Sequence, residues 1–376
     1  MNIKHFINFS ELSIADLDSW KEAGRLVAGV YCIYAPTELI RAAGIAPVSL
    51  CGKKQEPIKE AEKDLPASLC PLIKSSYGYG LNGTCPFFSA SDLLVAETTC
   101  DGKKKMYELM GELKPLHLMH LPHTQKGTSA FNYWLEGLYE LETFLQDFSG
   151  VQITEERLHN EIVLQNAIRR ELHEVAILAA DRRSPLTARD MLAVQESKSF
   201  AVFPDRYLTQ LTTLRQDLET HVQQPGLPEN RGLRVLLTGC PVGKGSDKTL
   251  LIAEELGARV VCMENCSGLK GMTLPVDETG NPHEALARRY LQIPCSCMTP
   301  NPNRPTSIKE MVDTFAVDAI IDLTWLGCHT YNAESTTLKR FVEEELGLPF
   351  LHIETDYSGS DTEQLRTRIE AFIELS

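Results

Sequence analysis

Short apolar segments alternate with amphipathic ones in the first third of the chain, and the aliphatic residues are concentrated in the short segments. We predict β-strands at residues 25–32, 45–50, 92–99 and 116–121. We predict α-helices at residues 6–24, 36–44, 72–78 and 103–112. Strands and helices that alternate over short connections form parallel βαβ units. This region is therefore expected to fold around an open parallel sheet.

The pattern between residues 133 and 218 changes to one helix after another. Thr154 is a suitable N-cap, because acidic residues fill the first turn after it. Thr187 and Asp190 have the spacing of a capping box, with aspartate in place of the usual glutamate. A polar, proline-containing segment at 223–231 indicates where the helical region ends.

The last third of the chain returns to alternating strands and helices. Strands are predicted at residues 234–238, 259–263, 319–324 and 349–353. Helices between them include residues 248–257 and 333–347. We therefore assign the chain to the α/β class, as two flavodoxin-like or Rossmann-like open parallel-sheet domains that face each other, with a helical spacer. The predicted bounds of the first domain, the spacer and the second domain are 1–130, 131–228 and 229–376.

Composition and charge narrow the possible environments and partners. Hydrophobic residues make up 43% and charged residues 23% of the 376 residues, which is ordinary for a globular protein. The formal net charge of −14 disfavours nucleic acid and anionic membrane surfaces as partners, because both attract basic patches. No run approaches the roughly 20 apolar residues of a membrane span, and residues 1–20 lack the apolar core of a signal peptide. We expect a cytoplasmic protein, with Lys103, Lys104 and Lys105 on a solvated helix face.

Eleven cysteines are many for a cytoplasmic chain, and most of them follow a predicted strand or precede a predicted helix. In a reducing compartment this count indicates metal or redox chemistry rather than disulfides. No Cys-x-x-Cys pair is present, which excludes zinc-ribbon and thioredoxin-type sites, and the closely spaced ferredoxin pattern is missing too. Cys295 and Cys297 are too close for both thiols to bind one iron comfortably. The remaining interpretation is an iron–sulfur cluster held by one cysteine from each of several loops.

The glycine-rich segment 236–246 has some features of a phosphate-binding loop but lacks its spacing. Gly239 precedes Gly243 by four residues rather than five, and Gly245 separates the lysine from the serine. The Gly-x-Gly-x-x-Gly pattern of dinucleotide sites is absent as well. Backbone N–H groups of a glycine-rich turn that enters a helix still suit an anion. We therefore predict that Gly239 and Gly243 contact an anionic metal–sulfur cluster, with Cys240 as a ligand.

Histidines and carboxylates at strand ends are further candidates for functional roles. His117 and His120 fall on opposite faces of the predicted strand, and together with His123 they are interpreted as structural or surface residues. Glu97, at the end of a strand, and His329, next to a candidate ligand, are our candidates for proton transfer. Other strand-end carboxylates, placed either to relay protons or to cap helices, are Asp101, Glu354 and Asp356.

Four segments carry a resemblance to a known family: Tyr31-Cys-x-Tyr-x-Pro-x-Glu-Leu-Ile-x-Ala-Ala-Gly, Cys70-Pro, Thr99-Cys-Asp-Gly and the loop at Cys328. The chain resembles, nearly from end to end, the superfamily of 2-hydroxyacyl-CoA dehydratase D-components and benzoyl-CoA reductases. The resemblance implies that Cys70, Cys100 and Cys328 hold a [4Fe-4S] cubane between two flavodoxin-like domains. Within the superfamily, the chain is most similar to the double-cubane cluster proteins, through segments that begin at Glu60, Lys74, Asp101 and Thr355.

The resemblance to that branch implies a double-cubane cluster, [8Fe-9S], whose second cubane takes three more cysteines of the same chain. With Cys51 kept in reserve, seven cysteines are candidates: Cys32, Cys85, Cys240, Cys262, Cys266, Cys295 and Cys297. We favour Cys240, Cys266 and Cys295, because each ends a βα unit of the second domain. Cys32 is the first alternative.

The resemblance also implies a function. Relatives of this type receive low-potential electrons from a separate ATP-hydrolysing iron–sulfur activator with an actin/hexokinase-like fold, and they reduce a small molecule. On this first interpretation the chain is an ATP-dependent iron–sulfur reductase that forms a homodimer. A second interpretation is a 2-hydroxyacyl-CoA dehydratase subunit with a single [4Fe-4S] cluster. A third is a non-catalytic electron carrier.

Overall fold

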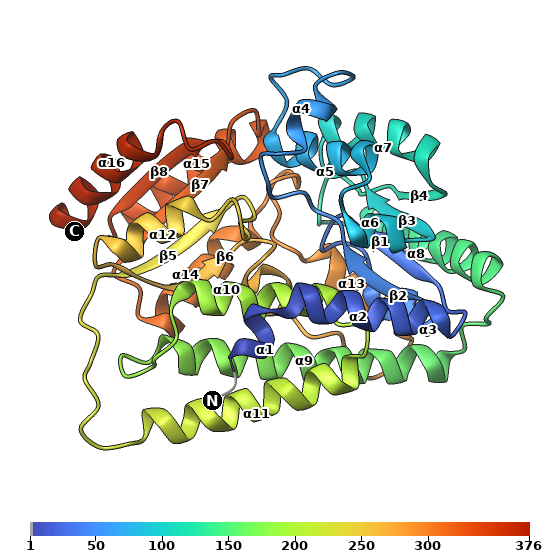
Figure 1. Cartoon of the computed structure of the whole chain (residues 1–376), viewed down its shortest axis with the longest axis horizontal. Helices are drawn as coiled ribbons and strands as arrows, with labels where there is room; N and C mark the ends of the chain where they lie inside the picture. The colour runs from blue at the N-terminus through green and yellow to red at the C-terminus, as the bar shows by residue number, and fades with distance from the viewer. Residues whose placement is uncertain (1–2) are drawn as a thin grey trace.

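The computed structural model describes residues 3–376, in which two four-stranded sheets lie over a layer of long helices (Figure 1). The first sheet has the order β2-β1-β3-β4 and consists of β1 (Val27–Val30), β2 (Ala46–Ser49), β3 (Leu93–Glu97) and β4 (Leu116–Met119). The second sheet has the order β6-β5-β7-β8 and consists of β5 (Arg234–Gly239), β6 (Arg259–Glu264), β7 (Ala319–Trp325) and β8 (Phe350–Thr355). Every neighbouring pair of strands is parallel. The predicted class, two open parallel-sheet α/β domains, is confirmed.

The two sheets have the same strand order. In each, the first and third strands in sequence are central neighbours, namely β1 with β3 and β5 with β7. Because the order of connection reverses between these two strands, a crevice forms at their carboxyl ends, where open α/β sheets place their sites. The central strands are buried along their whole length, as expected for a parallel sheet with both faces covered.

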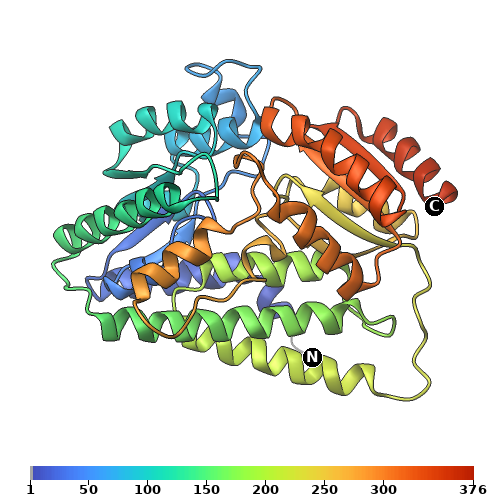
Figure 2. The same ribbon diagram turned by 180° about the vertical axis from the view of Figure 1, so that it is seen from behind.

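Helices connect the strands and cover the sheets (Figures 1 and 2). In the first half these are α1 (Lys4–Ile7), α2 (Phe9–Glu22), α3 (Thr37–Ala42), α4 (Ile58–Ala61), α5 (Pro71–Asn82), α6 (Pro86–Ala90) and α7 (Asp101–Leu113). In the last third they are α12 (Lys248–Glu255), η2 (Leu269–Gly271), α13 (Pro282–Leu291), α14 (Asn303–Phe315), α15 (His329–Arg340), the π-helical η3 (Phe341–Leu346) and α16 (Thr362–Leu375). The predicted helices of the first half all occur, whereas α13, α14 and α16 lie outside the segments for which a helix was predicted.

The helical stretch between the sheets consists of α8 (Thr128–Ser149), α9 (Glu155–Ala180), α10 (Ala188–Ser197), the 3-10 turn η1 (Lys198–Phe200) and α11 (Pro204–Val222). Thr154 caps α9, because its hydroxyl oxygen accepts a hydrogen bond from the Arg157 N–H at 3.2 Å. Thr187 and Asp190 form the capping box at the start of α10. Both predicted caps are confirmed.

Helix α9 contributes to the cores of both halves. Leu158 and Ile162 pack in the core of the first sheet, together with residues of β1 and β3. Further along the helix, Ile168 and Leu172 pack in the core of the second sheet, together with residues of β5, β6 and β7. The same continuous helix therefore sets the position of one sheet relative to the other. The predicted domain bounds stay a prediction.

A third core cluster joins the two halves directly. It contains Leu50 and Leu72 from the first half and Leu237 and Trp325 from the second. The Tyr357 hydroxyl also donates a hydrogen bond across this interface, to a main-chain carbonyl oxygen of the first half at 3.2 Å. The carboxyl ends of the two sheets thus face each other across a shared interior. Within residues 3–376, no helix is long and apolar enough to cross a membrane.

Candidate functional site

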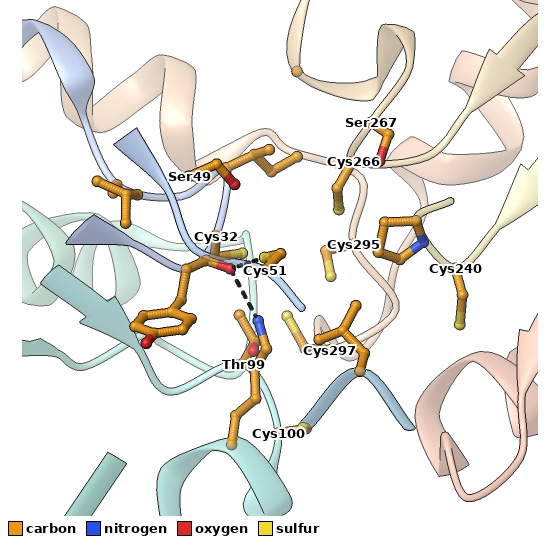
Figure 3. Close-up of a pocket in the computed structure, with 18 of the residues that line it drawn as sticks. Cys32, Ser49, Cys51, Thr99, Cys100, Cys240, Cys266, Ser267, Cys295 and Cys297 are labelled. Atoms are coloured by element: carbon orange, nitrogen blue, oxygen red, sulfur yellow. Dashed lines mark hydrogen bonds between the residues drawn. The ribbon is translucent and has the colours of Figure 1, made fainter. Parts of the chain in front are cut away.

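A cavity of about 510 Å³ lies where the two halves meet, and its wall includes residues of both sheets' loops and of the middle helices. Nine of the eleven cysteines line it, many more than chance burial of small apolar residues would gather in one place. They are Cys32, Cys51, Cys70, Cys100, Cys240, Cys266, Cys295, Cys297 and Cys328. Figure 3 shows several of these sulfurs directed toward a common space.

The strand order explains why cysteines distant in sequence converge. Cys32 and Cys100 follow the central strands β1 and β3, and Cys240 and Cys328 follow the central strands β5 and β7. These strand ends are the crevices that the parallel topology creates in each sheet. Because the two sheets present these ends to each other, all four cysteines reach one cavity.

Three of the cavity cysteines also begin helices. Cys70, Cys100 and Cys328 are the N-cap residues of α5, α7 and α15. Main-chain N–H groups of the first turn bond to each sulfur and lower the pKa of its thiol. A helix N-terminus carries partial positive charge, which stabilises a thiolate or an anionic cluster. The three predicted ligands of the first cubane therefore share one local geometry.

The Cys328 sulfur links a first group of thiols. The thiols of Cys240 and Cys70 both donate hydrogen bonds to Cys328, and these bonds lower the pKa of Cys328 well below its ordinary value. The same interactions, together with burial, raise the pKa of Cys70 and Cys240. One negative charge shared among three adjacent sulfurs is the charge state expected where thiolates are grouped to bind a metal.

A second group of thiols comes from loops of both halves. The hydrogen bond from the Cys297 thiol, followed in size by the charge of Lys270, lowers the pKa of Cys295 to about 6, although burial opposes this. The charges of Cys266 and Cys295 act in turn on Cys32, which places these sulfurs near one another. Figure 3 shows them around one space, with Cys240 set apart.

The structure thus divides the expected ligands differently from the predicted grouping. Cys240 is expected beside Cys266 and Cys295, but its thiol contacts Cys328 instead. Cys32, the first alternative, is the cysteine that lies with Cys266 and Cys295. Cys100 lies between the two groups, since the charges of both Cys328 and Cys295 act on it.

Two candidate cysteines, Cys85 and Cys262, do not line the cavity within the described part of the chain. Cys262 lies inside β6 and is buried in the core on the helix-covered side of the second sheet. Cys85 is the N-cap of α6 and packs at the edge of the interface core. Both therefore fit the ordinary role of cysteine as a small buried apolar residue.

The two glycines predicted to contact a cluster have packing roles. Gly239 has φ +104°, and a Cβ there would overlap the Leu323 carbonyl oxygen of the neighbouring strand. A Cβ at Gly243 would overlap the side chain of Lys53. Neither glycine lines the cavity among residues 3–376, although Cys240 between them does. Close backbone approach explains why glycine is needed at both positions.

The proton-transfer candidates differ in their access to the cavity. Glu97 is fully buried at the end of β3, and burial raises the pKa of its carboxyl to about 8 against the opposing charge of Lys103. It lies behind the cavity wall rather than on it. His329 is exposed and lines the cavity, as does His123, for which a surface role was predicted. The remaining strand-end carboxylates are peripheral: Asp101 is exposed, and Glu354 and Asp356 lie off the cavity.

Several cations line the cavity that the sequence did not indicate. Lys103 turns inward, and its ammonium donates to the Tyr31 carbonyl oxygen at 3.3 Å, so its assignment to a solvated helix face was wrong. The reason is that Lys103 lies in the first turn of α7, directly behind Cys100. The other cations are Arg41, Lys53, Lys104, Arg169, Lys198 and Arg289. They come from elements scattered over the chain, so no local pattern could group them.

The chemistry of the cavity wall suits an iron–sulfur cluster better than a single metal ion. Within residues 3–376, no three His, Cys, Asp or Glu side chains lie close enough together to hold one ion. The donors are instead thiols spread over two groups, as a cluster requires when it distributes its ligands over several irons. Zinc sites take closely spaced ligands, and calcium or magnesium sites take carboxylates.

The family model of the 2-hydroxyglutaryl-CoA dehydratase D-component matches residues 32–375. The chain belongs to this family. The chain is 41% identical over 376 residues to the protein named "Putative dehydratase subunit YjiM" of Escherichia coli (strain K12), covering 98% of this chain and 97% of that protein. It is 25% identical to the (R)-phenyllactyl-CoA dehydratase beta subunit of Clostridium sporogenes, covering 94% and 92% of the two chains.

A further match is shorter. Over 44% of each chain, this D-component family member is 25% identical to one of the subunits of the benzoyl-CoA reductase of Thauera aromatica. Together these matches confirm the resemblance to the dehydratase and benzoyl-CoA reductase superfamily. The chain therefore shares its family with subunits of enzymes.

Proposed function

We propose that this protein is an iron–sulfur reductase that holds a double-cubane cluster in the cavity and reduces a small molecule there. The observation that carries the proposal is the set of nine cysteines on one cavity, arranged in two groups. A single cubane takes at most four cysteines. The number of thiols and their division into two groups therefore support two joined subclusters.

The ligand assignment follows the two groups. Cys70, Cys100 and Cys328 are the proposed ligands of one subcluster, and the N-termini of their three helices would offset its negative charge. Cys266 and Cys295 are proposed for the other, together with Cys240 or Cys32. The position of Cys32 near both sulfurs favours it as the third ligand. When bound, the cluster would supply electrons at low potential to a molecule in the cavity.

The electron source that we propose is a separate ATP-hydrolysing iron–sulfur activator with an actin/hexokinase-like fold. The lack of a phosphate-binding loop in segment 236–246 agrees with ATP hydrolysis on a partner. The net charge of −14 suits transient docking on a complementary surface. We also propose a cytoplasmic homodimer.

Two other functions remain as alternatives with distinct signatures. The names of the relatives, among them a phenyllactyl-CoA dehydratase subunit, favour a 2-hydroxyacyl-CoA dehydratase subunit with a single [4Fe-4S] cluster. The cations on the cavity wall would suit the phosphates of coenzyme A. A non-catalytic electron carrier would show reversible redox chemistry without turnover of any substrate.

The proposal is tested by iron and acid-labile sulfide per chain after anaerobic purification. We expect about two cubanes of iron, and loss of cluster assembly in Cys70→Ser, Cys100→Ser and Cys328→Ser. The matched control is Cys85→Ser, because Cys85 also caps a helix and precedes a proline but lies off the cavity. Full iron content in all three ligand variants would refute the central claim, and one cubane per chain would favour the dehydratase.

The third ligand of the second subcluster is tested by comparing Cys32→Ser with Cys240→Ser. If Cys32 is the ligand, its variant should lose about half of the iron while Cys240→Ser keeps most of it. The reverse result would restore the grouping expected from sequence. Electron paramagnetic resonance of the reduced protein would show which subcluster remains.

A further inference from the structure

Part of the cavity is lined by cations rather than by cysteines. Arg41 of α3, Arg169 of α9, Lys198 of η1 and Arg289 of α13 form this surface, here called the basic wall. The charges of the three arginines act on Lys198, which places all four groups near one another. The basic wall and the cysteines thus line the same cavity from different elements.

The basic wall has little negative charge to balance it. Glu38 accepts hydrogen bonds from Arg169 and from the Tyr290 hydroxyl, the latter at 2.7 Å, and lies outside the cavity lining. Among residues 3–376, the carboxylates that do line the cavity are Asp101 and Glu196. Both are already paired with lysines, at 2.7 and 2.5 Å.

Main-chain carbonyls hold two of the cations in place without neutralising them. The Arg41 guanidinium donates to the carbonyl oxygens of Ala201 and Val202. The Arg289 guanidinium donates to the carbonyl oxygens of Leu274 and Gly271. Carbonyl acceptors orient a guanidinium but leave its positive charge free to act on a ligand, so the wall is preorganised.

Several polar atoms of this part of the cavity have no partner among the described residues. The Lys198 ammonium makes no hydrogen bond and no ion pair within residues 3–376. Buried side-chain atoms that line the cavity and also lack a hydrogen bond are Thr37 Oγ1, Arg41 Nε, Gln165 Nε2, Arg169 Nε and Gln195 Oε1. Buried polar groups are normally satisfied, so a cluster of exceptions asks for a missing partner. All but Gln195 Oε1 can donate, so the partner should bring acceptors and negative charge.

We propose that the basic wall binds a small oxyanion, either a carboxylate or an inorganic oxyanion. Its oxygens would accept hydrogen bonds from Lys198, Arg41 and Arg169, and its charge would balance the cations. The anion site stands on these contacts alone. That it holds the anionic group of the reductase substrate, with the reducible part directed toward the cysteines, rests on the proposed function.

The site is tested by isothermal titration calorimetry of the full-length protein with sodium acetate, sodium phosphate and, as a neutral probe, acetamide. We expect one anion to bind and acetamide not to bind. Lys198→Met should weaken anion binding at least tenfold, because it removes the unpaired ammonium while keeping a side chain of similar length. The control Lys309→Met, an exposed lysine paired within its own helix, should bind within twofold of the wild type.

The choice between the two probes identifies the source of the anion. Preference for acetate supports a carboxylate substrate, and preference for phosphate supports an inorganic oxyanion. Equal affinity in the wild type and in Lys198→Met, or no binding of either anion, overturns the proposal. Unfolding midpoints of the two lysine variants show whether a lost affinity reflects the site or a misfolded protein.

Proton uptake gives a second readout. Burial, followed in size by the charge of Arg169, lowers the pKa of Lys198 to about 7, so at pH 8 most of the ammonium has lost its proton. A bound anion favours the charged form, so binding at pH 8 should take up a proton, seen as a dependence of the binding enthalpy on the buffer. Lys198→Met should abolish this dependence. Uptake that persists in the variant would overturn the assignment to Lys198.

The other charged groups around Lys198 do not titrate near neutral pH. Arg41 and Arg289 keep their charges, because burial lowers the pKa of each only to about 10. Glu38 stays ionised, because Arg169 and Tyr290 hold its pKa at about 2. Of the other elements packed against η1, β2 has no charged residue. The charged groups of α10 and α2 that are paired with other residues are Arg189, Asp190, Glu196, Asp16 and Lys21, and those of α2 that are exposed are Glu11, Asp18 and Glu22.

The anion site and the proposed function can fail independently. Anion affinity is measured by heat and does not require the cluster. Full iron content without anion binding would overturn this inference alone. Anion binding in a protein that never assembles a cluster would overturn the proposed function alone.

Discussion

Replacing Arg304 with methionine is expected to destabilise the second half of the protein strongly. Arg304 is fully buried between β5 and β7. Its guanidinium is 3.4 Å from Glu264, 3.2 Å from Asp322 and 2.5 Å from Glu334, and it also donates to the Thr238 hydroxyl oxygen at 3.0 Å. Arg304→Met keeps most of the side-chain volume but leaves two carboxylates buried without this partner.

The size of the effect follows from what remains. Removing one partner of a buried ion pair costs about 3–5 kcal/mol. Glu264 keeps Lys270 at 3.0 Å, and Asp322 keeps His352 at 3.0 Å, so the cost of these two pairs lies near the lower limit. The third carboxylate is 18% exposed, and its pair adds no more than about 1 kcal/mol. We expect a loss of about 3–4 kcal/mol in the free energy of unfolding.

The assay is guanidinium chloride unfolding followed by tryptophan fluorescence, since Trp325 is buried at the end of β7. The control is Arg170→Met, because Arg170 is 61% exposed and makes one surface ion pair, whose loss costs less than about 1 kcal/mol. A change of slope with denaturant would show that cooperativity had been altered rather than stability alone. An Arg304→Met protein within about 1 kcal/mol of the wild type would refute the reasoning.

The pH dependence gives an independent check of the same prediction. The hydrogen bond from His352 and the charge of Arg304 lower the pKa of Asp322 despite its burial. A carboxyl whose pKa is lower in the folded state stabilises the protein above its unfolded pKa and loses that contribution as the pH falls. The difference between the wild type and Arg304→Met should therefore be largest near pH 7 and shrink toward pH 4. A difference that grows on acidification would contradict the ion-pair explanation.

Two further predictions concern single positions. Glu38→Gln should cost about 3 kcal/mol at pH 7, because the pKa of the buried Glu38 is lowered to about 2, and the two proteins should converge in unfolding experiments between about pH 5 and pH 2. A constant difference over that range would contradict the prediction. Gly239→Ala should cost at least about 2 kcal/mol more than Gly257→Ala in thermal unfolding, because both glycines have positive φ but a Cβ would clash with backbone only at Gly239. Equal costs would show that backbone conformation alone matters.

Local patterns in the sequence were sufficient for most elements of the fold. A parallel strand buried on both faces is a short aliphatic run, and a helix N-cap has a small set of residue types, so β1 to β8 and the caps of α9 and α10 could be predicted. Helices α13 and α14 were not predicted, because they lie in a long connection rich in prolines and cysteines, in which no strand pattern marks their ends. The repeated placement of cysteines after strands was also visible, and the parallel topology turned it into a common cavity.

The identity of the cysteines that share the cavity was decided by the tertiary structure. Cys70 and Cys85 each precede a proline and cap a helix, yet only the former lines the cavity, because their helices face different neighbours. Cys240 contacts Cys328 rather than the other thiols of the second half, because β5 and β7 are adjacent in the sheet. Local spacing contains no information on such neighbours.

The sequence by itself determined the fold class, the family resemblance and a set of cysteines suited to cluster chemistry, because these depend on local periodicity and residue type. The basic wall was decided by the tertiary structure alone. Arg41, Arg169, Lys198 and Arg289 lie far apart in the chain and look like ordinary polar residues of four separate elements. They become a site only because α9 spans both halves and brings α3, η1 and α13 to one cavity. Packing between distant segments creates a binding surface that no local pattern of residues encodes.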